Sequence, residues 1–284
     1  MTMLISFNHV LALGLIYGLV ALGVYFTFRL MRFPDLSVDG TFPLGAAVSA
    51  VLLIHGVHPL LTMIGAFFAG LIAGYVTGIL NIYLRIMGLL AGILTMTALY
   101  SVNLRIMGQP NIALLDVPTL FSNETSGLWL LAGMVLFISF ACYFFMVSEQ
   151  GLALRASGMN PQMSQSYGIC TRHMTLLALA LSNGLVALSG ALFAEMQGFA
   201  DVSLGTGTIV IGLASIMIGE AIVGSRTIKL DLLGCILGAI IYRLAIALAL
   251  NSQFLGLQAS DLNFITAIIV ILALGLPKLR KLTS

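Results

Sequence analysis

The stretch that decides the fold is Gly18-Leu19-Val20-Ala21-Leu22, because the chain contains it twice. It recurs 166 residues later as Gly184-Leu185-Val186-Ala187-Leu188, and eight of the twenty positions from 18 to 37 are identical between the copies. The same offset places Phe33, Asp35 and Ser37 on Phe199, Asp201 and Ser203. Because this Phe-x-Asp-x-Ser pattern lies outside the apolar bias of the chain, it favours a true internal repeat over a chance match.

Both copies lie in a chain that is apolar almost throughout. Of its 284 residues, 60% are hydrophobic and 8% are charged, and the mean hydropathy is +1.11. A soluble domain carries roughly 25% charged residues, and so few charges cannot cover a water-facing surface. The net charge of +2 gives no reason to expect a nucleic-acid partner, and three widely separated cysteines predict neither a metal site nor a disulfide framework. The composition predicts an all-α, polytopic helical protein embedded in a lipid bilayer.

Polar clusters divide the chain into nine candidate spans, since a helix needs about 20 apolar residues to cross a bilayer. The second and seventh candidates are short and contain glycine, which predicts re-entrant or half-buried helices. We expect a single transmembrane domain over residues 1–284. The candidate spans are 9–28, 41–54, 59–84, 86–104, 127–147, 173–194, 208–224, 230–250 and 261–276.

The repeated stretch falls in the first and the sixth candidate span, so an odd number of crossings separates the copies. The two halves, about 9–104 and 173–276, are therefore predicted to be inverted relative to each other. Inverted repeats are a transporter architecture, and paired short segments point to a substrate pathway at their interface. The segments 41–54 and 208–224 are such a pair, although their glycines could instead serve close helix packing.

The distribution of Lys and Arg predicts the orientation, because these residues concentrate in cytoplasmic loops. A cytoplasmic C-terminus leaves only Arg105 outside, and nine spans then place the N-terminus outside. The basic residues predicted on the cytoplasmic side are Arg29, Arg32, Arg85, Arg155, Arg172, Arg226, Lys229, Lys278, Arg280 and Lys281.

The predicted cytoplasmic segment 148–172 has a pattern of its own. Gly158 is expected to end one short helix, and Asn160-Pro161 to cap and start a second that reaches Tyr167. Two short amphipathic helices beneath a membrane suit docking into a groove on a soluble partner. A linker that lies on lipid headgroups is the alternative.

Within this segment small, basic and amide residues recur at a fixed spacing: Gly151, Ala153, Arg155, Ala156, Gly158, Asn160, Ser164, Gly168 and Ile169. This spacing resembles the coupling-helix loop of ATP-binding-cassette (ABC) importer permeases of the branched-chain amino-acid and ribose type. The stretch 35–40 (Asp-Leu-Ser-Val-Asp-Gly) resembles the Asp-Leu-Ser-Val-Gly signature of the sugar branch, with Asp39 inserted before the glycine. The run 205–224 is similar to the Gly-rich segment of the family, although Glu220 stands where many members have a second glycine. Stretches 92–100 and 107–111 resemble a subgroup of tryptophan- and tyrosine-type permeases.

The resemblance covers essentially the whole chain and implies the permease subunit of an ATP-driven importer in a bacterial plasma membrane, moving an amino acid or similar small organic solute. It implies a homodimer with a second permease copy, an ABC ATPase dimer and an extracytoplasmic substrate-binding protein or lipoprotein. The chain has no Gly-x-x-x-x-Gly-Lys-(Ser/Thr) motif, so we expect no enzymatic activity and no cofactor in it, with ATP and Mg in the ATPase subunit. The residues implied in ATPase coupling are Gly151, Leu154, Arg155, Ala156, Gly158, Asn160, Pro161 and Gly168.

Three ionisable residues fall within candidate spans, where an unpaired charge is costly and marks a functional candidate. Glu195 and Arg243 are both predicted in the outer half of the membrane, so they could form an ion pair. Glu220 lies toward the cytoplasmic side and could pair with Arg226 or face an inner vestibule.

Uncharged polar residues are the other candidates for the substrate pathway, although Thr and Met more often pack than bind. Thr95, Met96 and Thr97 lie on the fourth candidate span. Asn263 and Thr266 lie on the ninth, which is its equivalent in the second half. The repeat-related Asp35 and Asp201 are expected either to cap helices or to line gates.

An ion-coupled secondary transporter with inverted repeats is the alternative function, with Glu195 or Glu220 as the coupling carboxylate. A scaffolding membrane subunit is a third hypothesis, but it would have no need of paired broken segments. The docking-type segment 148–172 favours the ABC permease.

Overall fold

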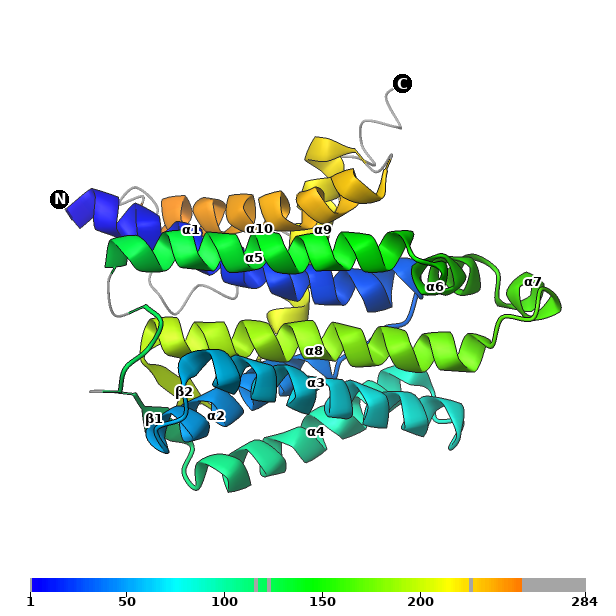
Figure 1. Ribbon diagram of the computed structural model, residues 1–284, viewed down its shortest axis with the longest axis horizontal. Coiled ribbons are helices and arrows are strands. Elements are labelled where there is room, and N and C mark those ends of the chain that lie inside the picture. The colour runs from blue at the N-terminus through cyan, green and yellow to red at the C-terminus, as the bar shows by residue number, and fades with distance from the viewer. Residues whose placement is uncertain (1, 115–116, 122–123, 225–226, 252–284) are drawn as a thin grey trace.

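The computed structural model describes residues 2–114, 117–121, 124–224 and 227–251, which form a helical bundle with one short pair of strands (Figure 1). The predicted all-α class is confirmed apart from that pair, in which β1 and β2 are antiparallel. In chain order the elements are α1 (Thr2–Val24), the π-helix η1 (Tyr25–Leu30), α2 (Val38–Ile54), α3 (Pro59–Ile82), α4 (Gly88–Met107), β1 (Asn111–Ala113), α5 (Glu124–Val147), α6 (Glu149–Met159), α7 (Pro161–Ser166), α8 (Thr171–Gln197), β2 (Phe199–Asp201), α9 (Thr208–Val223) and α10 (Ile228–Asn251).

Among the described residues, six helices are long and apolar enough to cross a membrane, and they correspond to six of the nine predicted spans. The helices α2 and α9 are apolar but shorter, as predicted for the second and seventh candidates. The ninth candidate, 261–276, lies outside the described residues. The six spans are Phe7–Leu30, Pro59–Ile82, Gly88–Met107, Gly127–Val147, Thr171–Gln197 and Ile228–Ala249.

The helices that carry the repeated stretch lie at the centre of the packing. The helix α8 packs against α2 and α3, while α1 packs against α9 and α10. In Figure 1, α1 runs from the N-terminus toward α6, and α8 runs back from α7 to β2, so the two helices have opposite directions. Each therefore packs on two helices that belong to the other half of the sequence.

Glycines permit the close contact between α2 and α8. A Cβ atom on Gly45 would overlap the backbone carbonyl of Ala187, and one on Gly190 would overlap the carbonyl of Phe42. In the same way, a Cβ atom on Gly219 of α9 would overlap the backbone of Gly234 on α10. Small residues at helix contacts are the usual way in which membrane helices approach each other, and these glycines have that packing role.

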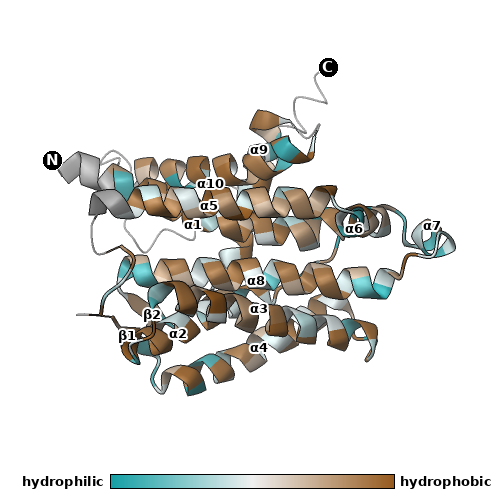
Figure 2. Ribbon diagram, viewed as in Figure 1, coloured by the Kyte–Doolittle hydropathy of each residue, from teal (hydrophilic) through white to brown (hydrophobic). Residues whose placement is uncertain are grey.

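The outward faces of the long helices are apolar, as Figure 2 shows for α3 and α5. Ile72 on α3 is 65% exposed, and Phe137 on α5 is 73% exposed. A soluble monomer rarely exposes contiguous apolar surface on this scale. Together with the six long apolar helices, these faces identify a multi-pass membrane protein.

Candidate functional site

A buried polar network fixes the start of α2 against α8. The Ser37 amide and hydroxyl donate hydrogen bonds to Asp35 Oδ1 at 2.9 and 2.5 Å, and the Asn183 side-chain amide donates to Asp35 Oδ2 at 2.8 Å. The Thr41 hydroxyl donates to Asn183 Oδ1 at 2.8 Å. Each of these four side chains is 2% exposed or less. Because Asn183 lies near the midpoint of α8 (Thr171–Gln197), α2 begins beside the middle of a spanning helix.

Asp201 makes the same local contacts in the second half. The Ser203 amide and hydroxyl donate to Asp201 Oδ1 at 2.7 and 2.5 Å, as those of Ser37 do to Asp35. The Asn111 side chain donates to the other oxygen, Asp201 Oδ2, at 3.1 Å. The hydrogen bond from the Ser203 hydroxyl holds the pKa of Asp201 below its ordinary value of 3.8. The two aspartates therefore hold the turns that lead into the short helices, which is closer to the capping role than to the gating role.

The two short helices meet at Asp39, in the first turn of α2. One carboxylate oxygen of Asp39 accepts from the Ile209 amide at 2.8 Å, and the other accepts from the Gly207 amide at 3.1 Å. Gly207 is the N-cap of α9 and has no side chain to satisfy these donors. The positive end of the α9 dipole also favours a carboxylate here. Sequence reasoning did not select Asp39, although its insertion into the Asp-Leu-Ser-Val-Gly signature was a signal.

Glu195 is buried on the side of α8 that faces α2 and α3. Its carboxylate accepts from Ser49 at 3.3 Å, from Thr62 at 3.2 Å and from the Leu120 amide at 3.3 Å. The predicted ion pair with Arg243 is wrong, because the Arg243 guanidinium lies over the ring of Tyr17 on α1, 3.9 Å from its centroid. Although Glu195 and Arg243 were predicted at a similar depth in the membrane, their side chains point to different neighbours.

Glu220 forms an ion pair with Arg29, with 2.7 Å between Nε and Oε1. The predicted partner Arg226 lies outside the described residues. Packing of α9 along α1 places Glu220 beside η1, and sequence spacing alone could not indicate this distant partner.

The predicted pathway residues on α4 do not share one surface. Thr95 is 4% exposed and accepts a hydrogen bond from Thr77 on α3 at 3.0 Å. Thr97 is exposed and donates to the carbonyl of Ile93 in its own helix, while Met96 is partly buried beside Gly40. Asn263 and Thr266 lie outside the described residues. Thr95 is thus a packing residue, as Thr in such positions usually is.

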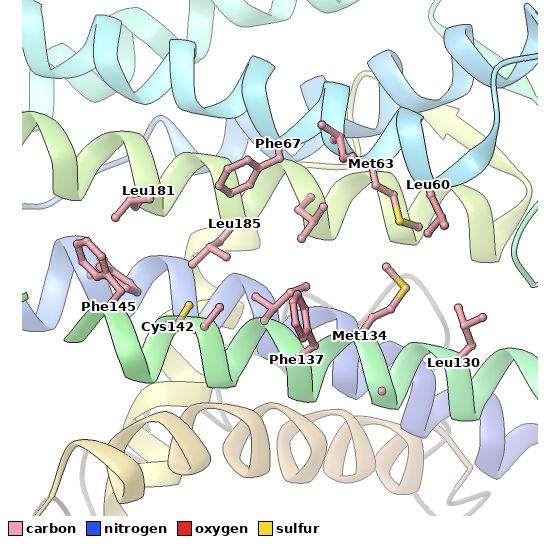
Figure 3. A pocket seen from close by; sticks show the side chains of 16 residues that line it. Leu60, Met63, Phe67, Leu130, Met134, Phe137, Cys142, Phe145, Leu181 and Leu185 are labelled. Atoms are coloured by element: carbon pink, nitrogen blue, oxygen red, sulfur yellow. The ribbon is translucent and has the colours of Figure 1, made fainter. Parts of the chain in front are cut away.

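A cavity of about 820 Å³ lies between α5 and the pair α3 and α8 (Figure 3). In Figure 3, Phe67 and Leu185 form one wall, and Phe137 and Cys142 on α5 form the other. The lining residues that the structure describes are all apolar, and Thr95, Met96 and Thr97 are not among them. Within this described part of the chain, the lining offers no charged side chain to a polar solute.

The segment 148–172 forms the two predicted short helices, but Gly158 lies inside α6 and does not end it. α6 ends at Met159, and Asn160 caps α7 by accepting from the Met163 amide at 3.1 Å, with Pro161 in the first helical position. Gly168 follows α7 with a φ of +83°, which favours glycine. Figure 1 shows both helices at the end of the bundle opposite the N-terminus.

The residues predicted for coupling divide between two faces of this segment. Leu154 is fully buried, and Cβ atoms on Gly151 and Gly158 would overlap backbone carbonyls of Phe145 and Leu30. These three residues seat α6 on the bundle. Arg155 is partly buried, and its Nε has no hydrogen-bond partner among the described residues.

The outward face of α6 and α7 carries exposed apolar side chains. Met159 is 77% exposed, Met163 is 54% exposed and Tyr167 is 76% exposed. Met163 and Tyr167 lie four residues apart on α7 and its C-cap and so share one side of it, whereas the extended Asn160 separates them from Met159 on α6. The Gly and Leu positions of the motif attach α6 to the bundle, whereas this apolar face is open to a partner.

Comparisons with known proteins agree with one another. The family model described as branched-chain amino acid transport system, permease component, matches residues 6–276. A tyrosine transport system permease protein of Clostridioides difficile is 42% identical over 262 residues, which cover 92% of this chain and 88% of that protein. An uncharacterized protein of Rickettsia prowazekii is 35% identical over 268 residues, which cover 92% of this chain and 94% of that protein.

More distant similarity extends to an autoinducer 2 import system permease protein of Escherichia coli. It is 27% identical over 219 residues, which cover 74% of this chain and 62% of that protein. Among solved structures, PsaBC from Streptococcus pneumoniae in complex with Fab matches with a TM-score of 0.56 and 16% identity, covering 93% of this chain and 89% of that chain. At this identity the match shows a shared fold alone.

Proposed function

This chain belongs to the family of permease components of branched-chain amino acid transport systems, and on that premise we propose that its cargo is an aromatic amino acid, with tyrosine as the first candidate. As a member of this family, the chain is the non-catalytic membrane subunit of an ABC importer for a small solute. The observation that carries the cargo assignment is the 42% identity to a tyrosine permease across 92% of the chain. The autoinducer permease, at 27% identity, gives weaker support to a sugar-like cargo.

The proposed architecture is a single domain of nine spans with inverted halves. The matching turns at Asp35–Ser37 and Asp201–Ser203 support the repeat. So do the opposite directions of α1 and α8 and their reciprocal packing. In this arrangement α2 and α9 are the paired broken helices, and their junction at Asp39 adjoins the proposed substrate pathway.

The proposed ATPase-docking surface is the outward face of α6 and α7. Its centre is Met159, Met163 and Tyr167, which are exposed apolar side chains suited to a groove on a soluble subunit. ATP and Mg would act in that subunit, and a binding protein or lipoprotein would deliver cargo to the opposite side. The basic residues beside α6 and α7 support a cytoplasmic position for this end, with the N-terminus outside. A second copy of the chain completes the proposed pathway.

Co-purification tests the proposed assembly. The tagged chain, extracted from its native membrane in mild detergent, is expected to retain a stoichiometric ATPase with a Gly-x-x-x-x-Gly-Lys-(Ser/Thr) motif, identified by mass spectrometry. Recovery of the permease alone, combined with uptake driven by a proton or sodium gradient, would favour the secondary transporter instead.

Uptake by the purified complex tests the cargo. Proteoliposomes containing the complex and its binding protein are expected to accumulate labelled tyrosine only with internal ATP. Unlabelled tyrosine or tryptophan should compete, whereas leucine and ribose should not. Competition by ribose without competition by tyrosine would overturn the aromatic assignment and leave the importer assignment intact.

A further inference from the structure

The π-helix η1 joins the end of α1 to several other elements. Its register is marked by the Met31 amide, which donates to the Phe26 carbonyl five residues earlier at 3.4 Å. Single π-turns within α-helices are rare and occur frequently at functional sites. The ring of Phe26 lies 6.0 Å from that of Phe145, at the end of α5, so η1 sits where α5 leads into α6.

On one side, η1 touches α6 backbone to backbone. A Cβ atom on Gly158 would overlap the Leu30 carbonyl and lie 3.2 Å from the Met31 Cα. No side chain separates the two segments at this point. Closely packed elements shift as units rather than deform continuously, so a displacement of α6 toward the bundle has to move the end of η1.

On another side, η1 holds the second half of the chain through two polar contacts. Arg29 pairs with Glu220 on α9, with 2.7 Å between Nε and Oε1. The Tyr25 hydroxyl donates to Asp231 Oδ2 on α10 at 2.9 Å. The Arg29 side chain is 50% exposed and that of Glu220 is 24% exposed, so this pair can separate and re-form at modest cost, unlike a fully buried pair.

We propose that η1 is the mechanical link between the coupling segment and the second half, and that Arg29, Glu220, Tyr25 and Asp231 are positioning residues for ATP-driven transport. Movement of α6 and α7 passes through the Gly158–Leu30 contact to η1, and from η1 through the two polar contacts to α9 and α10. The start of α9 is the end held by Asp39, so the link reaches the junction of the short helices. This inference rests on the proposed function, since it requires an ATPase on α6 and α7.

A purely structural role for the same contacts makes a different prediction. Loss of a structural contact would lower folded yield, ATPase recovery and transport together. If the contacts instead transmit movement, their loss would leave assembly and ATP hydrolysis unchanged, but ATP hydrolysis would no longer move α9. The deciding quantity is therefore the nucleotide-dependent change at α9 in complexes that still hydrolyse ATP.

A cysteine at the start of α9 gives a readout that does not depend on the cargo. In a Cys170→Ser background, which removes the exposed native thiol among the described cysteines, Thr206→Cys places an exposed thiol just before α9. Its maleimide labelling rate is measured in the co-purified complex, without nucleotide and after trapping with ATP and vanadate. The variants Arg29→Gln, Glu220→Gln and Tyr25→Phe are compared, with Arg32→Gln as the matched control because Arg32 is an exposed cation close to η1.

We expect the nucleotide-dependent change in labelling rate to be about fivefold or more smaller in Arg29→Gln and Glu220→Gln than in the parent. Fivefold is the lower end of typical allosteric coupling. Their ATP hydrolysis should persist, Arg32→Gln should behave as the parent, and the exchange Arg29→Glu with Glu220→Arg should recover part of the change. A full labelling change in Arg29→Gln and in Tyr25→Phe would overturn the link. Tyr25→Phe keeps the test decisive if a charge variant does not fold.

Failure of the proposed function gives a separate result. If no ATPase co-purifies with the parent chain, the importer assignment fails before any variant is compared. If the ATPase is present but tyrosine is not transported, only the cargo assignment fails. The labelling experiment then still decides whether η1 is the link.

Discussion

Asp39 contributes to the fold through backbone groups 168 and 170 residues away in sequence. Its carboxylate satisfies two amides at the start of α9, which the helix cannot satisfy itself. Local sequence shows an acidic residue in the first turn of α2, where it would be expected to favour its own helix dipole. In the structure, however, the Asp39 carboxylate caps α9 and not α2. The two helices come together only in the tertiary fold, so local sequence could not indicate this contact.

Removal of this carboxylate should destabilise the junction. We expect Asp39→Ala to cost about 1–2 kcal/mol, the usual penalty for loss of an N-terminal capping group, and Asp39→Asn to cost less because an amide oxygen can still accept. The measurement is the thermal unfolding midpoint in detergent. Glu149→Ala is the control, since Glu149 is an exposed residue in the first turn of α6. Equal midpoints for Asp39→Ala and the parent would contradict the capping role.

Asp201 should contribute a small pH dependence to stability. The Ser203 hydrogen bonds lower its pKa in the folded chain, so its contribution is present above the ordinary pKa of 3.8 and is lost as pH falls through the folded value. We expect the unfolding midpoint of the parent to fall more steeply below about pH 4 than that of Asp201→Asn. Parallel pH profiles for the two proteins would show that the Ser203 contacts have no net effect.

At the scale of elements, the coupling segment shows how much local sequence can specify. The break between α6 and α7 follows from Asn160-Pro161, through a three-residue cap and the backbone preference of proline, whereas Gly158 lies within α6 and packs against Leu30. The π-turn at Tyr25–Leu30 and the pairing of β1 with β2 have no comparable local signal. Both depend on contacts with segments distant in sequence, so no periodicity predicted them.

The outward face of α6 and α7 should be needed for binding of the ATPase. We expect Met163→Glu to reduce recovery of the ATPase about tenfold or more, because it places a charge in an apolar contact of the kind that dominates binding energy. Gln162→Glu, at an exposed polar position on the same helix, is the matched control. Quantitative mass spectrometry of the purified complex measures the ratio of ATPase to permease. A normal ratio in Met163→Glu would place the docking surface elsewhere.

At the scale of the whole molecule, the repeat predicted which helices are equivalent but not which ones touch. The match of 18–37 with 184–203 pairs α1 with α8, and this equivalence stays a prediction. It gave no indication that each would pack on the short and long helices of the other half. Partner choice depends on surfaces such as Gly45 against Ala187, and in a chain this rich in glycine many such surfaces are possible.

The contact between α2 and α8 offers a test of this interlocked packing. We expect Gly190→Val to destabilise the chain by about 3 kcal/mol or more, since the new side chain would overlap the Phe42 backbone and overpacking alone costs about 1–3 kcal/mol. Gly133→Val on α5 is the matched control, because a Cβ atom there meets no atom within 4 Å. Monodisperse yield and unfolding midpoint in detergent measure the difference. A Gly190→Val protein as stable as Gly133→Val would contradict the described contact.

The exchange of partners between halves also sets an order for biogenesis. While the first half is being inserted, α1 has none of its α9 and α10 contacts, and α2 and α3 await α8. More than 200 residues separate α1 from α10 in the sequence. At typical synthesis rates of about 5–20 residues per second, α10 is therefore completed on the order of ten seconds or more after α1. Until the rest of the chain has been synthesised, the first helices therefore lie in the membrane with the glycine-lined faces of their later contacts uncovered.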